Sequence, residues 1–267
     1  MQKVIIITGI SSGLGKSTAE YLSQKGHIIY GISRKLLEIN PKINVLKADV
    51  TDHESLKAAI ETVLKEEGKI DILINNAGMG ISGPIEYSSN EDIKLQMDTN
   101  FTGIVNLIKC VLPAMRKQRE GKIINISSIG GLMALPFQGF YSASKFAIEG
   151  LSEALRMELK PFHIKVVVIR PGDFFTGFTS NRKIDPILSD NPYEPQFRKT
   201  LSIIETDEKK GLKPEYFARK LALIIEQKNP HFTYIISTAE QKLAVILKIL
   251  LPEALFSSIL GSHYGIK

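Results

Sequence analysis

The sequence predicts an α/β protein with a Rossmann-type, doubly wound fold, in which a mostly seven-stranded parallel sheet carries helices on both faces. Three observations predict it. Short apolar runs alternate with amphipathic helical stretches along most of the chain. The runs are rich in Ile and Val, as strands buried on both faces are. The first run, residues 4–8, leads into a glycine-rich turn and then a helical stretch.

The elements follow one another as strand, helix, strand. Helical stretches begin after capping residues such as Thr51 or Asp52 and end at glycines such as Gly26. This alternation implies right-handed crossovers and therefore a parallel sheet. The predicted strands are residues 4–8, 28–32, 44–48, 71–74, 122–127, 165–169 and 232–236. The predicted helices are residues 14–24, 51–67, one or two helices within 93–118, 141–159 and 214–227.

Composition indicates one soluble domain covering residues 1–267, with 43% hydrophobic and 23% charged residues. The net charge of +6 is scattered, so we expect no nucleic-acid binding. Cys110 is the only cysteine, which excludes an internal disulfide and favours a reducing compartment. The five histidines lack metal-ligand spacing, so no metal site is expected. Without a leader or a spanning segment, we expect a cytoplasmic protein.

Two segments depart from the regular pattern. Residues 172–212 are rich in Pro, Asn, Asp and aromatic residues, and they predict an irregular substrate loop that acts as a lid. The tail, residues 238–267, is apolar but is broken by Lys248 and Pro252, so it is too short to cross a bilayer. Three interpretations of the tail stay open: peripheral contact with the inner membrane face, a cover for the substrate cleft, or a subunit contact.

The glycine-rich turn, TGISSGLGKS at residues 8–17, could be either of two nucleotide-binding loops. An ATP- or GTP-binding phosphate loop needs a glycine five residues before Gly15, and that position is Ile10. A dinucleotide-binding turn fits better. Gly9 lets the chain turn sharply, while Gly13 and Gly15 let the backbone and the following helix approach a pyrophosphate.

Further motifs follow this turn in order. The spacing TGxxxGxG resembles that of the short-chain dehydrogenase/reductases. The same family's NNAG, NISS, YxxxK and PGxxxT patterns occur here as residues 75–78, 125–128, 141–145 and 171–176. The resemblance covers about residues 3–236. The segment at 127–162 is especially similar to the branch that acts on hydroxysteroids, retinol and ketosphinganine.

The YxxxK pair predicts acid–base chemistry. Tyr141 and Lys145 lie four residues apart on a helix, so they share one face. A nearby ammonium group should lower the tyrosine pKa and let the phenol donate a proton to a carbonyl oxygen or accept one from an alcohol. Ser128 can hydrogen-bond the same oxygen. The resemblance implies that Asn100 holds a water next to Lys145 and completes a catalytic set of four.

The end of the second predicted strand decides the expected cofactor. No acidic residue occurs between His27 and Leu37, where one would bond the ribose hydroxyls of NAD. Ser33 and Arg34 stand there instead, and a guanidinium suits a 2′-phosphate, so NADP(H) is expected. The residues expected to bind it, several by resemblance alone, are Thr8, Gly9, Ser11, Ser12, Gly13, Leu14, Gly15, Ser33, Arg34, Asp49, Val50, Asn76, Ala77, Gly78, Tyr141, Lys145, Pro171, Gly172 and Thr176.

Apolar side chains suggest a lipid-like substrate. Leu132, Met133, Leu135 and Phe137 should lie near the substrate entrance. The aromatic residues of the loop either form a lid or pack it onto the core; they are Phe174, Phe175, Phe178, Tyr193 and Phe197. We therefore expect NADPH-dependent reduction of a hydrophobic ketone, or oxidation of the matching alcohol, the ketone being a steroid, 3-ketosphinganine or acyl dihydroxyacetone phosphate.

Two alternatives remain at this point. A 3-oxoacyl carrier-protein reductase is typically shorter and lacks both the long loop and the apolar tail. A non-catalytic NADP sensor would be marked by a broken catalytic set, and here all four residues are present. The resemblance also implies a homodimer or homotetramer, formed through the helices that contain Asn100 and Tyr141.

Overall fold

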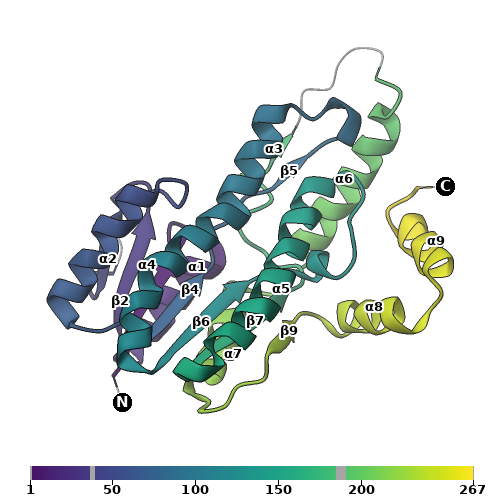
Figure 1. Ribbon diagram of the computed structural model, residues 1–267. Coiled ribbons are helices and arrows are strands. Elements are labelled where there is room, and N and C mark those ends of the chain that lie inside the picture. Colours follow the sequence, from purple (N-terminus) through teal and green to yellow (C-terminus); the bar gives the residue numbers. More distant parts are fainter. Residues whose placement is uncertain (1, 37–39, 185–190, 267) are drawn as a thin grey trace.

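A seven-stranded parallel sheet forms the centre of the protein (Figure 1). The computed structural model describes residues 2–36, 40–184 and 191–266. The strand order is β3-β2-β1-β4-β6-β7-β9, which confirms the predicted doubly wound fold. The strands are β1 (Val4–Thr8), β2 (Ile28–Ser33), β3 (Ile43–Lys47), β4 (Ile72–Asn75), β6 (Gly121–Ile126), β7 (Ile164–Pro171) and β9 (Thr233–Ile236).

The strand order reverses between β1 and β4, which pair in register from Ile5 with Ile72 to Ile7 with Ile74. The chain runs outward to β2 and β3 on one side of this point and to β6, β7 and β9 on the other. In such a sheet the connections on the two sides leave over opposite faces, which opens a crevice at the carboxyl ends of the central strands. The site is expected in that crevice.

Helices cover both faces because strand side chains alternate between them. Ile5 and Ile7 of β1 pack with α1 (Gly13–Gln24) and α7 (Pro214–Glu226). Val4 and Ile6 belong to the cluster on the other face, which includes residues of α2 (His53–Glu67), α4 (Gly103–Gln118) and α5 (Gly139–Leu159). Strands that are apolar on both faces therefore read as unbroken apolar runs in the sequence.

The predicted helical region 93–118 contains two helices joined by a π-helical segment. The first is α3 (Asn90–Met97), whose N-cap Ser89 accepts a hydrogen bond from the backbone N–H of Asp92. A π-helical segment, Asp98–Thr102, then leads into α4 without a break. Such π segments are rare and frequently mark functional sites.

The predicted irregular loop at residues 172–212 is partly wrong. It contains a 16-residue helix, α6 (Glu194–Lys209), and a short strand, β8 (Lys183–Ile184), which pairs with β5 (Ile81–Ser82). Phe197, Thr200 and Ile204 are buried at helical spacing, a periodicity that the flanking polar and proline residues obscure. Residues 185–190 of the predicted loop lie outside the described residues.

The apolar tail forms two further helices, α8 (Ala239–Leu250) and α9 (Glu253–His263). They follow β9 and are drawn in yellow in Figure 1. Val245 and Phe256 pack with Ile129 and Met133 in a third apolar cluster. Within the described part of the chain, no helix is long and apolar enough to cross a membrane.

Candidate active site

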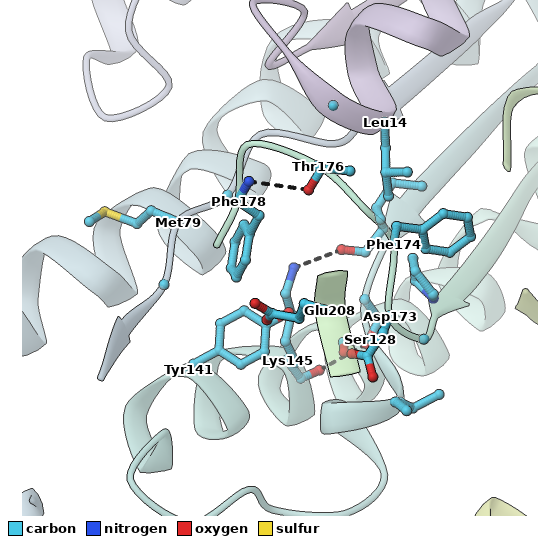
Figure 2. A pocket seen from close by; sticks show the side chains of 18 of the residues that line it. Leu14, Met79, Ser128, Tyr141, Lys145, Asp173, Phe174, Thr176, Phe178 and Glu208 are labelled. Atoms are coloured by element: carbon cyan, nitrogen blue, oxygen red, sulfur yellow. Dashed lines mark hydrogen bonds between the residues drawn. The ribbon is translucent and has the colours of Figure 1, made fainter. Parts of the chain in front are cut away.

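A cavity of about 990 Å³ opens at the carboxyl ends of the central strands. It extends from the glycine-rich turn to the α8–α9 pair, and Figure 2 shows part of it. Most of the predicted site residues line it. Three do not, because they lie behind the cavity wall: Thr8, Gly15 and Asn100.

The glycine-rich turn has the backbone that the sequence predicts. Gly9 and Gly13 both have positive φ angles, of 73° and 58°. A Cβ on Gly15 would lie only 2.2 Å from the carbonyl oxygen of Gly9, so α1 can pack against the turn only with glycine here. Helix α1 has no acidic residue in its first turn, and Ser11 and Ser12 line the cavity next to it. This helix start can therefore hold an anion.

Thr8 and Asn76 join the ends of β1 and β4 beneath this turn. The Thr8 hydroxyl accepts hydrogen bonds from the backbone N–H groups of Asn76 (3.0 Å) and Ala77 (2.8 Å). The Asn76 amide donates to the backbone oxygens of Thr8 (2.9 Å) and Gly9 (3.3 Å). These polar groups are engaged within the protein, so Thr8 supports the cavity from behind, while Asn76 lines it.

The far end of the cavity contains the predicted cofactor-selecting residues. Ser33 ends β2 and Arg34 follows it with an exposed side chain; both line the cavity. Asp49 and Val50, which follow β3, line it as well. The Asp49 carboxylate accepts hydrogen bonds from the backbone N–H (2.9 Å) and hydroxyl (2.8 Å) of Thr51, which fixes this turn.

Asn100 lies in the π-helical segment and is fully buried. Its amide oxygen accepts from the backbone N–H of Met79 (2.8 Å), and its amide nitrogen donates to the Met79 carbonyl (3.0 Å) and the Ser144 hydroxyl (3.1 Å). A Cβ built on Gly78 would lie 3.4 Å from the Asn100 amide oxygen and 3.7 Å from Lys145 Nζ. The Asn100 amide, Gly78 and the Lys145 ammonium therefore meet at one point.

Ser128, Tyr141 and Lys145 come together as the YxxxK spacing predicts (Figure 2). Ser128, just beyond the end of β6, faces the same space as Tyr141 on α5, and its hydroxyl acts to lower the pKa of the phenol. The Lys145 ammonium lies 5.7 Å from the centroid of the Tyr141 ring and donates to the backbone oxygen of Ile126 at 3.0 Å. One helix face and one strand end thus place a phenol, a hydroxyl and an ammonium around a single space.

The pKa values of this group differ from the expectation. Desolvation raises the pKa of Tyr141 to about 12, the hydrogen bond with Ser128 opposes the rise, and Glu208 adds to it. Burial lowers the pKa of Lys145 to about 8, against a smaller opposite effect of Glu149. The expected lowering of the tyrosine pKa is therefore wrong for this site, because desolvation dominates. The phenol keeps its proton at neutral pH.

The other half of the cavity is largely apolar. Met133 and Leu135 line it from the segment before α5, and Phe174 and Phe178 line it from the predicted lid. Helices α8 and α9 complete the wall with Leu247, Phe256, Ile259 and Leu260. The remaining predicted lid aromatics do not line the cavity: Phe197 is buried against Phe137, whereas Phe175 and Tyr193 are exposed.

Charged residues that the sequence reasoning missed line the same half of the cavity. Asp173 follows Gly172 inside the PGxxxT segment, and Asp207 and Glu208 lie in the last turn of α6. Burial, together with the nearby Glu208 and Asp207 carboxylates, raises the pKa of Asp173 to about 6, against smaller opposite effects of Gln241 and Arg182. The position of Asp173 could have been inferred from its motif. That of Glu208 depends on how α6 folds back over the sheet.

Comparison with known proteins identifies the family. The sequence model described as short chain dehydrogenase matches residues 3–186. A 3-ketodihydrosphingosine reductase from Bacteroides thetaiotaomicron is 49% identical over 266 residues, covering 99% of each chain. Two solved structures share 25% identity with this chain. A short-chain dehydrogenase from Streptomyces avermitilis has a TM-score of 0.83 and covers 100% of this chain and 99% of that one. One from Burkholderia cenocepacia in complex with NADP has a TM-score of 0.76, with 97% and 99% covered.

The chain therefore belongs to the short-chain dehydrogenase/reductase family and is an oxidoreductase. The resemblance read from the sequence motifs is confirmed. The family assignment rests on matches that cover well over half of the chain.

Proposed function

We propose that this protein is an NADPH-dependent reductase of long-chain ketones of the sphingoid-base type, which converts the ketone to a secondary alcohol. The observation that carries the proposal is one continuous cavity. Ser128, Tyr141 and Lys145 lie at its inner end, and α8 and α9 form an aliphatic wall further out. A polar reacting end beside an apolar wall suits a ketone on a long alkyl chain. The 49% identity to a 3-ketodihydrosphingosine reductase supports the same substrate class.

The residues present fit a phosphorylated nicotinamide nucleotide. The N-terminus of α1 and the turn before it would hold the pyrophosphate, because this helix start lines the cavity and has no acidic residue in its first turn to oppose an anion. Arg34 would hold the 2′-phosphate, and Asp49 and Val50 the adenine. Thr176, whose Cβ lies 3.2 Å from a Cβ built on Gly13, would close the site over the phosphates. The bound cofactor would supply a hydride to the carbonyl carbon.

Side chains of the protein would donate the proton that the carbonyl oxygen needs. Tyr141 keeps its proton at neutral pH, so it can donate it to the carbonyl oxygen as negative charge develops there. The Ser128 hydroxyl would hydrogen-bond the same oxygen. The Lys145 ammonium would stabilise the phenolate that remains and, with a water held at Asn100, return a proton to it. Asn100 acts here as a positioning residue, since it lies behind Gly78.

Two properties of the whole chain belong to the same proposal. The outer face of α8 and α9, where Ile246, Ile249, Leu250 and Leu255 are exposed, would contact membrane lipid and receive a water-insoluble substrate from it. A homodimer or homotetramer would form through α5 and the helical segment that contains Asn100 and continues into α4; Met157 of α5 is an exposed apolar residue.

The assay of the proposed function follows NADPH consumption with 3-ketosphinganine, a steroid ketone, retinal and acetoacetyl thioester. We expect 3-ketosphinganine to have the highest kcat/KM. Tyr141→Phe removes the proton donor and should lower kcat roughly 10²- to 10⁴-fold, with NADPH affinity retained. If Tyr141→Phe consumes NADPH as fast as the wild type does, the assigned chemistry is wrong. Tight NADPH binding without turnover of any carbonyl would instead favour a sensor.

The cofactor preference has its own test. Arg34→Asp replaces the guanidinium that would pair with the 2′-phosphate by a group that repels it, and charge-assisted pairs of this kind are strong. We expect the Kd of NADPH to rise roughly 100-fold, while that of NADH changes little. Arg219→Asp, on α7 outside the cavity, is the matched control. Equal changes for the two nucleotides would contradict NADPH selection.

A further inference from the structure

Three carboxylates meet on the cavity wall next to the predicted reacting group. Asp173 comes from the segment after β7, and Asp207 and Glu208 come from the end of α6. Glu208 and Asp173 both raise the pKa of Tyr141, which shows that their charges act on the phenol. Figure 2 shows Asp173 and Glu208 around the same space as Tyr141 and Ser128.

The three carboxylates are unequally compensated. Glu208 forms an ion pair with Arg182 and accepts a hydrogen bond from the Thr179 hydroxyl at 2.6 Å. Asp207 lies 3.1 Å from the His263 imidazole. Asp173 accepts only from the neutral Gln241 amide, at 2.6 Å; among the residues that the structure describes, none forms an ion pair with it. Asp173 is therefore the carboxylate on this wall that lacks an ion pair within the described part of the chain; the Arg182 guanidinium acts on it only from a distance, and Lys210 also lines the cavity.

A second, independent observation points to a ligand at the same place. Gln138, three residues before Tyr141, lines the cavity and is only 3% exposed. Its amide nitrogen has no hydrogen-bond partner within the described ranges. A buried donor without an acceptor is costly, so native proteins seldom keep one unless something else satisfies it. The missing partner would be an acceptor such as a hydroxyl oxygen.

A sphingoid ketone has a cation that could pair with Asp173 and a hydroxyl oxygen that could accept from the Gln138 amide. Its reacting carbonyl has an ammonium group on the adjacent carbon and a hydroxyl on the next one. If the carbonyl oxygen lies between Tyr141 and Ser128, the ammonium group must lie within a few bond lengths of it, on the cavity wall. A carboxylate with uncompensated charge is the natural acceptor for this group.

Resting on the proposed function, we propose that Asp173, with Glu208 beside it, binds the ammonium group next to the reacting ketone and that Gln138 binds the neighbouring hydroxyl. These residues would make the protein selective for 2-amino ketones over neutral ketones of the same length. Arg182 positions Glu208: its guanidinium pairs with that carboxylate and lies 5.7 Å from the ring centroid of Phe178, whose own centroid is 5.7 Å from that of Tyr141. The clustered carboxylates are then explained, because the bound ammonium offsets their repulsion.

The test compares two ketones on the full-length protein with NADPH: 3-ketosphinganine and 1-hydroxyoctadecan-3-one, which lacks only the amino group. We expect the wild type to prefer the amino ketone. Asp173→Asn keeps the shape and an oxygen for Gln241 but removes the charge. It should lower kcat/KM for the amino ketone roughly 10- to 100-fold, mainly through KM, and change the value for the neutral ketone less than about 3-fold. Gln138→Leu should weaken the binding of both ketones equally, since both carry the hydroxyl.

The matched control is Glu205→Gln, which removes a carboxylate from the same helix, α6, where it pairs with Lys209 on the surface. It should leave both ketones unaffected. Fluorescence titration with NADPH shows whether each variant retains a folded cofactor site. Equal losses for the two ketones in Asp173→Asn, or a wild type without preference for the amine, would overturn the ammonium assignment and leave the reductase function standing. A wild type that reduces neither ketone would remove the proposed function itself.

Discussion

At the scale of single residues, desolvation sets the protonation of Tyr141 and Lys145, which share one face of α5. The pKa of Tyr141 is raised to about 12 and that of Lys145 is lowered to about 8. Both shifts disfavour the charged form, as removal from water does for acids and bases alike. In the neutral range the phenol is therefore protonated and ready to act as an acid, while the ammonium titrates just above that range.

This arrangement predicts a pH dependence. The folded-state pKa of Lys145 is depressed, so its ammonium form is lost as pH rises through about 8, well before the Tyr141 phenol ionises. If the ammonium is needed, kcat/KM for ketone reduction should be level in the neutral range and fall about tenfold per pH unit above the Lys145 pKa. The pH profile of kcat/KM, which reports the free enzyme, checks this.

Lys145→Arg provides the comparison for this profile, because arginine stays protonated throughout the accessible range. We expect the residual activity of that variant to lack the alkaline decrease. If the decrease appears at the same pH in both proteins, it belongs to another group and the role given to Lys145 is wrong.

At the scale of elements, α8 and α9 have an inner face that lines the cavity and an outer face with exposed apolar side chains. Their inner side chains, including Leu247 and Phe256, line the cavity. The Gln241 amide of α8 hydrogen-bonds Asp173, and a Cβ on Gly172 would lie 2.0 Å from the Gln241 oxygen, so the PG turn and α8 pack directly. Of the three interpretations of the tail, the structure shows the cleft cover. The exposed apolar side chains on the outer face of α8 and α9 do not line the cavity, and we propose that they contact membrane lipid.

The outer face gives the prediction at this scale. Ile249 and Leu250 are 77% and 72% exposed, and inserting both into lipid would remove much apolar area from water. We expect the wild type to sediment with vesicles containing anionic phospholipid. The double variant Ile249→Glu/Leu250→Glu should have a vesicle affinity roughly tenfold lower or more.

The control for the vesicle experiment is Leu223→Glu on α7, which is 62% exposed and lies outside the α8–α9 pair. It changes charge and apolar area by a similar amount per residue. A wild type that stays in the supernatant, or a control that loses binding to the same extent, would contradict membrane contact through the tail.

At the scale of the whole molecule, local patterns determined the sheet and most of the cavity half next to the glycine-rich turn. Apolar runs predicted all seven strands of the main sheet to within about two residues. The pattern is clearest for central strands such as β1, β4 and β6, which are buried on both faces, and weaker for the edge strands β3 and β9. Motifs immediately after those strands, such as Asn76–Gly78 and Ser128, had to meet at one edge, since all carboxyl ends of a parallel sheet point the same way.

The apolar half of the cavity, where we propose that the substrate binds, was decided by tertiary structure alone. Glu208 comes within electrostatic reach of Tyr141 only because α6 folds back from 67 positions along the chain, and no local pattern records that return. Thr8 and Asn76 are predicted cofactor ligands, and only the tertiary structure shows that their side chains hydrogen-bond the backbone beneath the turn. Burial, which sets the pKa values of Tyr141, Lys145 and Asp173, is a property of the assembled fold. The sequence by itself thus determined which reactive side chains are present and that they lie at the carboxyl edge of the sheet. Packing decided which charged residues surround Tyr141 and how deeply each group is buried.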